Sequence, residues 1–398
     1  MENYNSKYHN QLRTFRRILD EYSADAPLAR FLPVFFRANR QMGSADRRNA
    51  SRLIYNYFRL GKAVSSLPPD ERLFVSEFLC NTDSSPFLAY FKPELAERIT
   101  LPLDEKIKQV SETVSSFNLS DVFPFTRHLS KDIEVHQFLK SFFIQPDLFI
   151  RLHPGKEKLV KERLRNADLS FQELSPNSLA LQNGTKLDQL FKEEMTPFEV
   201  QDLSSQETGL LFKPMAGDYW WDCCAASGGK SLLLFQQEAN VRILASDLRE
   251  NILDNLDKRF RNAGLTRFQK KVLDLTRNPA PFMHDYHFDG ILLDAPCSGS
   301  GTWGRTPELI SQFKPSRIDV FQRLQRSIAS NVAPYLKEGK PLIYMTCSVF
   351  REENEENVEF IARELGFTIE SQNVIKGYNR RADTMFAARL IKNGPVQH

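Results

Sequence analysis

The chain of 398 residues is long enough for two or three domains, at the usual length of about 100 to 200 residues each. Its 41% hydrophobic and 26% charged residues are ordinary for a globular protein, and no apolar run approaches the ~20 residues that a membrane-spanning helix needs. This composition excludes an integral helical membrane protein. The start of the chain lacks the basic and apolar regions of a secretory signal, so we expect a cytoplasmic protein.

The net charge is only +3, but the charge is unevenly distributed. Residues 1–63 contain 12 Lys and Arg against 5 Asp and Glu, whereas the rest of the chain is slightly acidic. A basic lobe suits a polyanion such as RNA, because phosphate neutralisation dominates nucleic-acid affinity. The charge alone indicates a solvated helical surface equally well.

The five cysteines are an odd number in a chain without an export signal, so we expect no disulfides. No C-x-x-C pair occurs. The adjacent Cys223 and Cys224 are expected to point to opposite faces of a strand, which argues against a zinc site, and no metal is predicted.

The first 125 or so residues are predicted to be helical, since apolar residues recur there every three or four positions. The segment from Arg98 to Phe117 is predicted to form one amphipathic helix that closes this bundle. Between about 140 and 195 the pattern changes to a small α+β segment, with short strands at Phe149–Leu152 and Leu179–Gln182 and a charged helix at Lys156–Arg165.

The remainder alternates strands and helices, which predicts a doubly wound α/β sheet. We expect strands near Tyr219–Cys223, Arg242–Ser246, Phe268–Leu273, Gly290–Leu293, Leu342–Met345, Phe367–Ser371 and Met385–Ile391. Helices are expected near Lys230–Glu238, Asn251–Asn262, Val320–Leu336 and Glu353–Leu365.

The turn after the first sheet strand has the form of a nucleotide-cofactor loop. Ala225-Ala-Ser-Gly-Gly229 lets backbone approach a ligand closely, and the next strand ends in Asp247, where an acid typically accepts ribose hydroxyls. Asp274 follows the third strand and could reach the base of a cofactor or cap a turn, and spacing favours neither. A dehydrogenase is disfavoured because no G-x-G-x-x-G follows a strand.

Two thiols follow two predicted core strands, Cys297 in Asp294-Ala-Pro-Cys297 and Cys347 in Thr346-Cys-Ser348. Because strands of such a sheet open onto one crevice at their carboxyl ends, both thiols are predicted to meet one ligand. A lone cysteine there is most often a small buried hydrophobe, but two beside polar turns and an acid favour function.

Two thiols, a carboxylate and a nucleoside cofactor together suit methylation of cytosine at carbon 5. Addition of a thiolate to carbon 6 makes carbon 5 nucleophilic, and a carboxyl group hydrogen-bonded to ring nitrogen 3 stabilises the charge that develops on addition.

Residues 145–392 resemble the S-adenosylmethionine-dependent RNA cytosine-C5 methyltransferases of the Sun/Fmu, RsmB-like and Nop-like family. The resemblance rests on Asp222-Cys-Cys-Ala-Ala-Ser-Gly-Gly-Lys230, Asp294-Ala-Pro-Cys-Ser-Gly-Ser-Gly-Thr302, and Tyr344-Met-Thr-Cys-Ser348 followed by Glu352-Glu-Asn354. Glu199-Val-Gln-Asp-Leu-Ser-Ser205 is similar to the family's lead-in to its catalytic domain.

The resemblance implies that Cys347 is the nucleophile, that Cys297 assists product release, that Asp294 holds the target cytosine and that Lys230 closes the site. It also implies S-adenosylmethionine as cofactor, bound by the loop and by acidic side chains: Cys224, Ala225, Ala226, Ser227, Gly228, Gly229, Lys230, Asp247, Asp274 and Asp294. The sequence departs from the family pattern at three places. Ser227 replaces a proline, Ile252 replaces an arginine, and the late Asp-Gly-Phe-Phe motif is Asp383-Thr-Met-Phe386.

The resulting expectation is a Rossmann-like methyltransferase domain over residues 206–398, preceded by a small α+β connector over 140–205 and an all-α domain over 1–130. The all-α domain faintly resembles NusB-like RNA-binding domains through Ser51-Arg-Leu-Ile-Tyr-Asn-Tyr-Phe-Arg59. We expect a monomer that acts on RNA, first of all ribosomal RNA, at a cytosine that is single-stranded or flipped. The alternatives are a DNA or tRNA cytosine methyltransferase, or an RNA-binding scaffold without catalysis.

Overall fold

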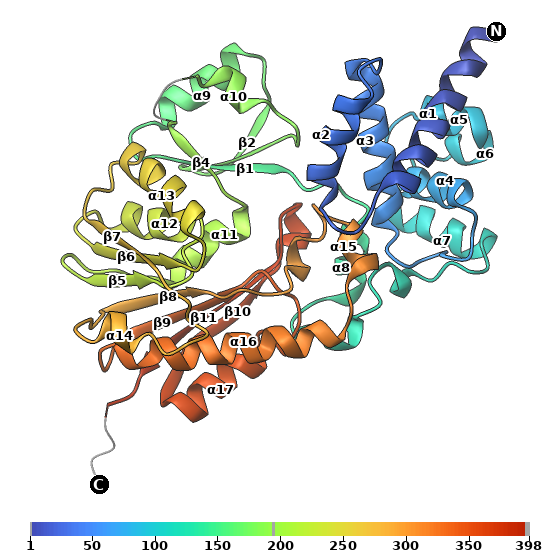
Figure 1. Cartoon of the computed structure of the whole chain (residues 1–398). Coiled ribbons are helices and arrows are strands. Elements are labelled where there is room, and N and C mark those ends of the chain that lie inside the picture. Colours follow the sequence, from blue (N-terminus) through green and yellow to red (C-terminus); the bar gives the residue numbers. More distant parts are fainter. Residues whose placement is uncertain (1, 193–195, 395–398) are drawn as a thin grey trace. The chain divides into compact units, whose positions relative to one another are not determined.

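The computed structural model describes residues 2–192 and 196–394, and the chain divides into two compact units (Figure 1). The first unit, here called the helical unit, contains Met1–Arg127, Glu134–Gln145 and Thr302–Pro315. The second unit, the sheet unit, contains His128–Ile133, Pro146–Gly301 and Ser316–His398.

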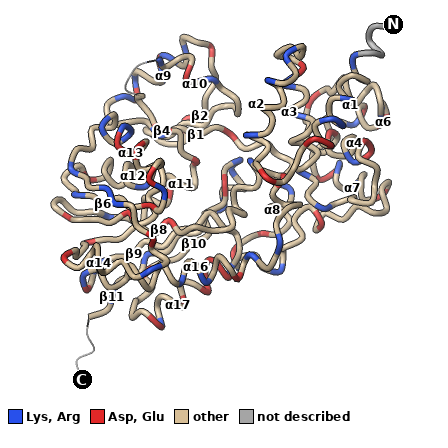
Figure 2. Tube along the Cα trace, in the orientation of Figure 1, with Lys and Arg blue, Asp and Glu red and all other residues tan. Residues whose placement is uncertain are grey.

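The helical unit confirms the predicted helical start of the chain. Its helices are α1 (Glu2–Glu21), α2 (Leu28–Ala38), α3 (Ser44–Arg59), α4 (Pro69–Cys80), α5 (Pro86–Phe91), α6 (Pro93–Ala96), α7 (Leu103–Thr113), α8 (Val135–Ser141) and α15 (Glu308–Gln312). Phe15, Leu53 and Phe78 are fully buried between them. Basic and acidic residues are intermixed over this unit (Figure 2). In the described part of the chain, no helix combines the length and the apolar character that crossing a membrane requires.

The predicted helix over Arg98–Phe117 is wrong at both ends. Helix α7 starts only at Leu103, directly after Pro102, and ends at Thr113. Because proline disfavours helical backbone in the residue before it, a helix cannot easily continue from Arg98 through Pro102. The apolar periodicity extends across this break because residues on both sides of it are buried in the same core.

The segment Thr302–Pro315 packs in the helical unit, whereas the sequence suggested one continuous methyltransferase domain from 206 onward. Trp303 is fully buried, and its ring lies 5.6 Å from Phe123 and 5.0 Å from Phe313. The backbone N–H of Leu28 donates to Glu308 Oε1. The aromatic side chains of this segment therefore complete a core that is formed mainly by residues far earlier in the chain.

The connector forms a four-stranded antiparallel sheet inside the sheet unit, with strand order β2-β3-β1-β4. Its elements are β1 (Leu148–Leu152), α9 (Glu157–Asn166), β2 (Phe171–Ser175), β3 (Ser178–Leu181), α10 (Leu187–Leu190) and β4 (Phe198–Val200). The helix and the strands β1 and β3 were predicted. Strands β2 and β4 were not, since the side chains of β2 are mostly exposed and β4 has only three residues.

The second sheet has seven strands in the order β10-β11-β9-β8-β5-β6-β7. The strands are β5 (Tyr219–Asp222), β6 (Arg242–Asp247), β7 (Phe268–Val272), β8 (Gly290–Asp294), β9 (Pro341–Thr346), β10 (Phe367–Ile375) and β11 (Met385–Lys392). Strands β5 to β9 are parallel, whereas β11 is antiparallel to both β9 and β10. All seven predicted strands are present, which confirms the doubly wound α/β prediction.

Helices cover both faces of this sheet, α12 (Gly229–Gln237) and α13 (Glu250–Asn262) on one and α16 (Ser316–Val332) and α17 (Glu355–Leu365) on the other (Figure 1). The short helices α11 (Leu203–Glu207) and α14 (Ala280–Met283) complete the unit. Successive residues of a strand point to opposite faces, so Trp220 lies in the core beneath α12 and Trp221 in the core beneath α16.

The order of the parallel strands reverses between β5 and β8, because β6 and β7 extend the sheet on one side and β9 on the other. In open α/β sheets, ligands bind at the carboxyl ends of the strands at such a reversal. The loop after β5 and the loop after β8 therefore flank the expected binding crevice.

Leu292 lies fully buried in β8, between β5 and β9. We expect Leu292→Ala to lower the free energy of unfolding of the sheet unit by about 2–5 kcal/mol, since it removes buried methyl groups and leaves a cavity. Leu210→Ala, at a leucine that is 76% exposed, is the matched control and is expected to change stability by less than about 0.5 kcal/mol. Chemical denaturation monitored by circular dichroism measures both values, and equal losses would contradict the assignment of Leu292 to the core.

Candidate active site

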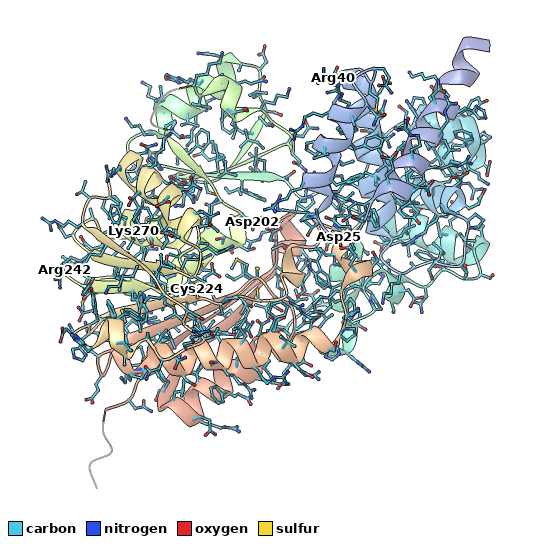
Figure 3. All side chains as sticks on the ribbon, in the orientation of Figure 1. Asp25, Arg40, Asp202, Cys224, Arg242 and Lys270 are labelled. Carbon is cyan, nitrogen blue, oxygen red and sulfur yellow. The ribbon has the colours of Figure 1, made fainter. Side chains whose placement is uncertain are left out.

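The loop between β5 and α12 carries the predicted cofactor-binding residues. The strand ends at Asp222, so Cys223 and Cys224 lie in the turn. The prediction that they point to opposite faces of a strand was therefore wrong. Cys223 is buried, which raises the pKa of its thiol well above the usual value, and it interacts with the partly exposed Cys224. Figure 3 labels Cys224 just beyond β5. The argument against zinc from strand alternation therefore fails, although residues 2–192 and 196–394 contain no cluster of three metal-ligating side chains.

One glycine of the loop, Gly228, is required by its geometry. Gly228 has a left-handed φ of +82°, and a Cβ atom there would overlap the ring of Phe260. The Ala225 N–H donates to Ser246 O at the end of β6, and the Gly228 N–H donates to Ala225 O. The loop is thus tied to the neighbouring strand in a compact turn in front of helix α12.

Asp247 ends β6 next to this loop, as predicted for a ribose-binding acid. Its Oδ2 accepts from the Ala226 N–H at 3.0 Å, and its Oδ1 accepts from both the backbone and the Nε of Arg249. Burial alone would raise the pKa of Asp247, but these hydrogen bonds lower it, so the carboxylate is ionised at neutral pH. Arg249 is the cation beside this acid, and position 252, where the family has arginine, is Ile252.

Ser227, the position where the family has proline, is held by a side chain that the sequence analysis did not single out. Arg259 Nη1 donates to Ser227 O at 2.9 Å and to Ser227 Oγ at 2.7 Å, and Arg259 Nε donates to Glu199 Oε2. Glu199 also contacts the ring of His153. These contacts restrain the loop where a proline ring would otherwise do so.

Asp274 lies directly beyond β7 and caps a turn. Its Oδ1 accepts from the N–H and the hydroxyl of Thr276, and its Oδ2 pairs with Arg277. The hydrogen bond from Thr276 lowers the pKa of this carboxyl group. Of the two alternatives that the sequence left open, the turn cap is what the structure contains, and a contact with a cofactor base stays a prediction.

Lys230 and Asp294 form an ion pair with 2.9 Å between Nζ and Oδ2. Lys230 is the second residue of α12 and is buried, and its Nζ also donates to Ser205 Oγ at 2.8 Å. Asp294 ends β8 and remains 32% exposed, so one face of its carboxylate is open to a ligand. The sequence predicted both residues for one site, and the structure brings them into contact across the strand reversal.

Asp222 is a second carboxyl group close to this pair. It is 1% exposed, and burial raises its pKa to about 7. Its Oδ2 accepts from Ser231 Oγ at 2.6 Å, which lowers the pKa, whereas the nearby charge of Asp294 contributes to raising it.

The two predicted thiols meet. Cys297 Sγ and Cys347 Sγ are 3.3 Å apart, both partly exposed and both unoxidised. Asp294 pairs with Met345 across the β8–β9 ladder, so the carboxylate and both thiols leave adjacent strands at the same edge. The hydrogen bond to Cys347, together with burial, raises the pKa of Cys297 well above its usual value. Cys297 therefore keeps its proton at neutral pH, and either sulfur can be the donor in the contact between the two thiols.

Glu353 holds both cysteine loops and was not singled out by spacing. Its fully buried carboxylate accepts from the Ser298 N–H at 2.9 Å and from Ser348 Oγ at 2.7 Å. Gln325 Nε2 donates to it as well, at 2.8 Å. Ser298 and Ser348 directly follow the two cysteines, so one carboxylate fixes both loops. The Glu352-Glu-Asn354 motif was the only sequence signal for this residue.

Close backbone contacts of Gly301 fix the loop after Cys297. The Gly301 N–H donates to Cys347 O, and the Thr384 N–H donates to Gly301 O, both at 2.9 Å. A Cβ atom at Gly301 would overlap the carbonyl groups of Thr384 and Cys347. Residues 383–386, which depart from the family motif, therefore still contact the loops that carry the thiols.

The fold is that of Rossmann-like methyltransferases. The chain is similar to PH0851, with a TM-score of 0.68 and 20% identity over 90% of this chain and 93% of that chain. It is also similar to NSun6 from Pyrococcus horikoshii, solved with SFG, with a TM-score of 0.60 and 20% identity over 68% of this chain and 97% of that one. A methyltransferase homolog protein from the same organism gives a TM-score of 0.56 and 19% identity over 67% and 92% of the two chains.

Within this class, residues 209–390 match the family model described as 16S rRNA methyltransferase RsmB/F. Ribosomal RNA small subunit methyltransferase B of Yersinia enterocolitica is 29% identical over 252 residues, which are 61% of this chain and 58% of that protein. The protein of the same name from Salmonella paratyphi A is 32% identical over 203 residues, which are 48% and 46% of the two chains. The chain thus spans about half the length of the curated relatives it matches.

The raised pKa of Cys297 predicts slow alkylation at neutral pH, because only the thiolate reacts. Its reaction with iodoacetamide, followed by mass spectrometry, should reach half of its maximal rate at a clearly higher pH than that of glutathione. Cys347→Ala removes the hydrogen bond that contributes most to this shift, so it should move the profile of Cys297 toward lower pH. A wild-type profile that coincides with that of glutathione would contradict the assignment.

Glu353→Gln introduces an NH2 group among groups that donate to the carboxylate. We expect a loss of about 1–3 kcal/mol in the free energy of unfolding, since one buried donor loses its acceptor. Glu359→Gln, on the exposed side of α17, is the matched control and should be neutral. Chemical denaturation compares the two variants, and an unchanged stability of Glu353→Gln would show that this carboxylate does not hold the loops.

Proposed function

We propose that the protein transfers a methyl group from S-adenosylmethionine to carbon 5 of a cytosine in RNA, with ribosomal RNA of the small subunit as the first candidate. The observation that carries the proposal is the contact of two thiols, 3.3 Å apart, on strands adjacent to the Lys230–Asp294 pair. Support also comes from the family model that matches the domain and from the names of its curated relatives.

The residues around the strand reversal fit the proposed cofactor. Asp247 is ionised and suited to accept ribose hydroxyls, and residues 224–229 bring backbone close to the ligand. Asp294 ends β8 and Asp274 follows β7, so both lie at the carboxyl ends of parallel strands of the same sheet. NSun6, which shares the fold, was solved with SFG, an analogue of S-adenosylmethionine. When bound, S-adenosylmethionine supplies an electrophilic methyl group.

Cys347 is the proposed nucleophile. Its sulfur attacks carbon 6 of the cytosine as a thiolate, and a bond forms between Sγ and carbon 6 while electron density moves toward carbon 5 and ring nitrogen 3. Asp294, with Oδ2 held by Lys230, has Oδ1 available for the polar edge of the base. As a carboxylic acid, Asp294 donates its proton to ring nitrogen 3 while electron density moves there, and Lys230 fixes the other carboxyl oxygen before the reaction.

Cys297 is proposed to assist release of the methylated cytosine from Cys347. Its raised pKa keeps the proton on its sulfur, and the hydrogen bond to Cys347 stabilises the neighbouring thiolate. After methyl transfer, a base removes the proton from carbon 5, the bond between Sγ and carbon 6 breaks, and Cys347 leaves as a thiolate. A donor 3.3 Å away stabilises this leaving group. The asymmetry between the two thiols supports the roles that the family resemblance implies.

The helical unit is proposed to be an RNA-binding domain. Twelve Lys and Arg against five Asp and Glu in residues 1–63 give this part of the chain a positive charge that attracts phosphate.

Exchange of the cysteines tests the proposal. Cys347→Ala should lower methyl transfer by at least roughly 10³-fold and abolish the covalent complex with RNA that contains 5-fluorocytidine, since no thiolate can add. Cys297→Ala should instead accumulate a covalent complex with ordinary RNA, because release is impaired. Denaturing gel electrophoresis with radiolabelled RNA measures both effects.

Bisulfite sequencing of total RNA from cells with and without the gene identifies the methylated cytosine, and a site in 16S rRNA is expected. Loss of the covalent complex only in Cys297→Ala would assign the nucleophile to Cys297 and would favour a DNA-type mechanism. Calorimetry that detects no S-adenosylmethionine binding would favour a scaffold without catalysis.

A further inference from the structure

A cavity of about 770 Å³ lies inside the sheet unit, away from the thiols, on the side of the connector sheet that faces α11. Its charged lining residues are Arg151, Arg380, Arg381, Asp147 and Glu207. Three arginines against two carboxylates leave one net positive charge. Arg380 pairs with Glu207 and Arg381 pairs with Asp147. The charge of Arg151 interacts with that of Glu199, its neighbour across the ladder on β4, which does not line the cavity.

Arg151 is held in an unusual state. It is 1% exposed, and its Nε donates to Gln201 Oε1 at 2.7 Å. Among the described residues, neither Nη1 nor Nη2 has a hydrogen-bond partner. Burial lowers the pKa of Arg151 to about 10, so the guanidinium stays protonated at neutral pH. Two buried terminal nitrogens without hydrogen-bond acceptors are costly, which points to a ligand for them.

The surroundings of Arg151 favour an anion with several oxygens. Arg151 alternates along β1 with Ile150 and Leu152, which belong to the apolar core beneath α9, so it projects from the opposite face. Ser178 lies directly across from it on β3, and its buried hydroxyl has no hydrogen-bond partner either. Two parallel N–H donors and a hydroxyl match the oxygens of a phosphate group.

The rim of the cavity can admit such a group. The Arg380–Glu207 pair there is partly exposed, with side chains 44% and 30% accessible. Exposed ion pairs contribute little to stability, so an incoming anion can replace Glu207 at Arg380 at low cost.

A chain of hydrogen bonds connects Arg151 with the candidate active site. Gln201, which accepts from Arg151, donates through Nε2 to Ser205 Oγ at 3.1 Å. Ser205 Oγ also accepts from Lys230 Nζ, and Lys230 pairs with Asp294. A phosphate bound at Arg151 would thus be fixed relative to the carboxylate proposed to hold the cytosine.

We propose that the Arg151 cavity binds a backbone phosphate of the RNA substrate and so positions the strand that carries the target cytosine. This inference rests on the proposed function for the identity of the substrate. Arg151 is a positioning residue, since it contacts neither the reacting atoms nor the cofactor loop.

The test compares Arg151→Met with wild type in binding to a 16S rRNA transcript across a series of salt concentrations. The variant should bind about tenfold more weakly, because a charge-assisted contact is lost. The slope of log affinity against log salt should become shallower by about 0.7, the value for one phosphate contact on a single strand. Arg165→Met, at an exposed arginine of α9, is the matched control and should leave affinity and slope within twofold and 0.2 of wild type, roughly the scatter expected of a surface change.

Three further measurements make the outcome decisive. S-adenosylmethionine binding by calorimetry should be unchanged in Arg151→Met, and its thermal stability should not fall, because two buried nitrogens without acceptors are removed. Wild-type affinity and slope in the variant would overturn the proposal. If Arg151→Met fails to fold, Arg151→Lys decides, since it keeps the charge but loses the paired donors, and unchanged RNA affinity there would likewise overturn the proposal.

Inorganic phosphate separates the two sources of the anion. Phosphate could raise the thermal stability of wild type while Arg151→Met leaves RNA binding unchanged. These two results together would assign the cavity to a small free anion and overturn the RNA assignment. Methyl transfer by wild type is measured in parallel. If wild type binds the transcript but methylates no cytosine, the proposed function fails, whereas the dependence of binding on Arg151 still decides this inference.

Discussion

One buried carboxylate sets the geometry on which the site depends. Glu353 accepts hydrogen bonds from the residues that directly follow Cys297 and Cys347, so two loops that leave different strands are held in one arrangement. Thiols without such a restraint would sample many separations, and a small displacement costs a reacting pair much of its advantage. Burial raises the pKa of Glu353, whereas the hydrogen bonds from the surrounding donors lower it and so stabilise the ionised carboxylate that accepts them.

Most of the sheet could be predicted, because its strands are short apolar runs that end in polar turns. Gly290–Asp294 and Pro341–Thr346 are nearly fully buried, and this makes them distinctive in sequence. The convergence of Asp294, Cys297 and Cys347 also followed from the pattern, since parallel strands present their carboxyl ends at one edge. The sequence could not rank the two thiols, since the hydrogen bond and the burial that raise the pKa of Cys297 exist only in the folded protein.

Other features escaped because their partners are distant in the chain. Arg259 restrains Ser227, and Glu199 restrains Arg259. No sequence pattern links these three residues, because they are far apart in the chain. The exposed strand β2 lacks the apolar alternation by which strands are recognised. The predicted helix from Arg98 failed because apolar spacing continued across Pro102, although the backbone could not.

The excursion of the chain after Gly301 has a consequence for how the protein can be divided. The strand β8 and the loop with Cys297 run directly into Thr302–Pro315, which packs in the helical unit before the chain returns at Ser316. No single cut therefore separates the two units intact. A fragment that begins at residue 206 would carry Trp303 and Ile310 with their apolar surfaces uncovered, and a fragment of residues 1–130 would lack them. The core of the helical unit is accordingly complete only when residues 302–315, which follow β5 to β8 in the chain, have been synthesised.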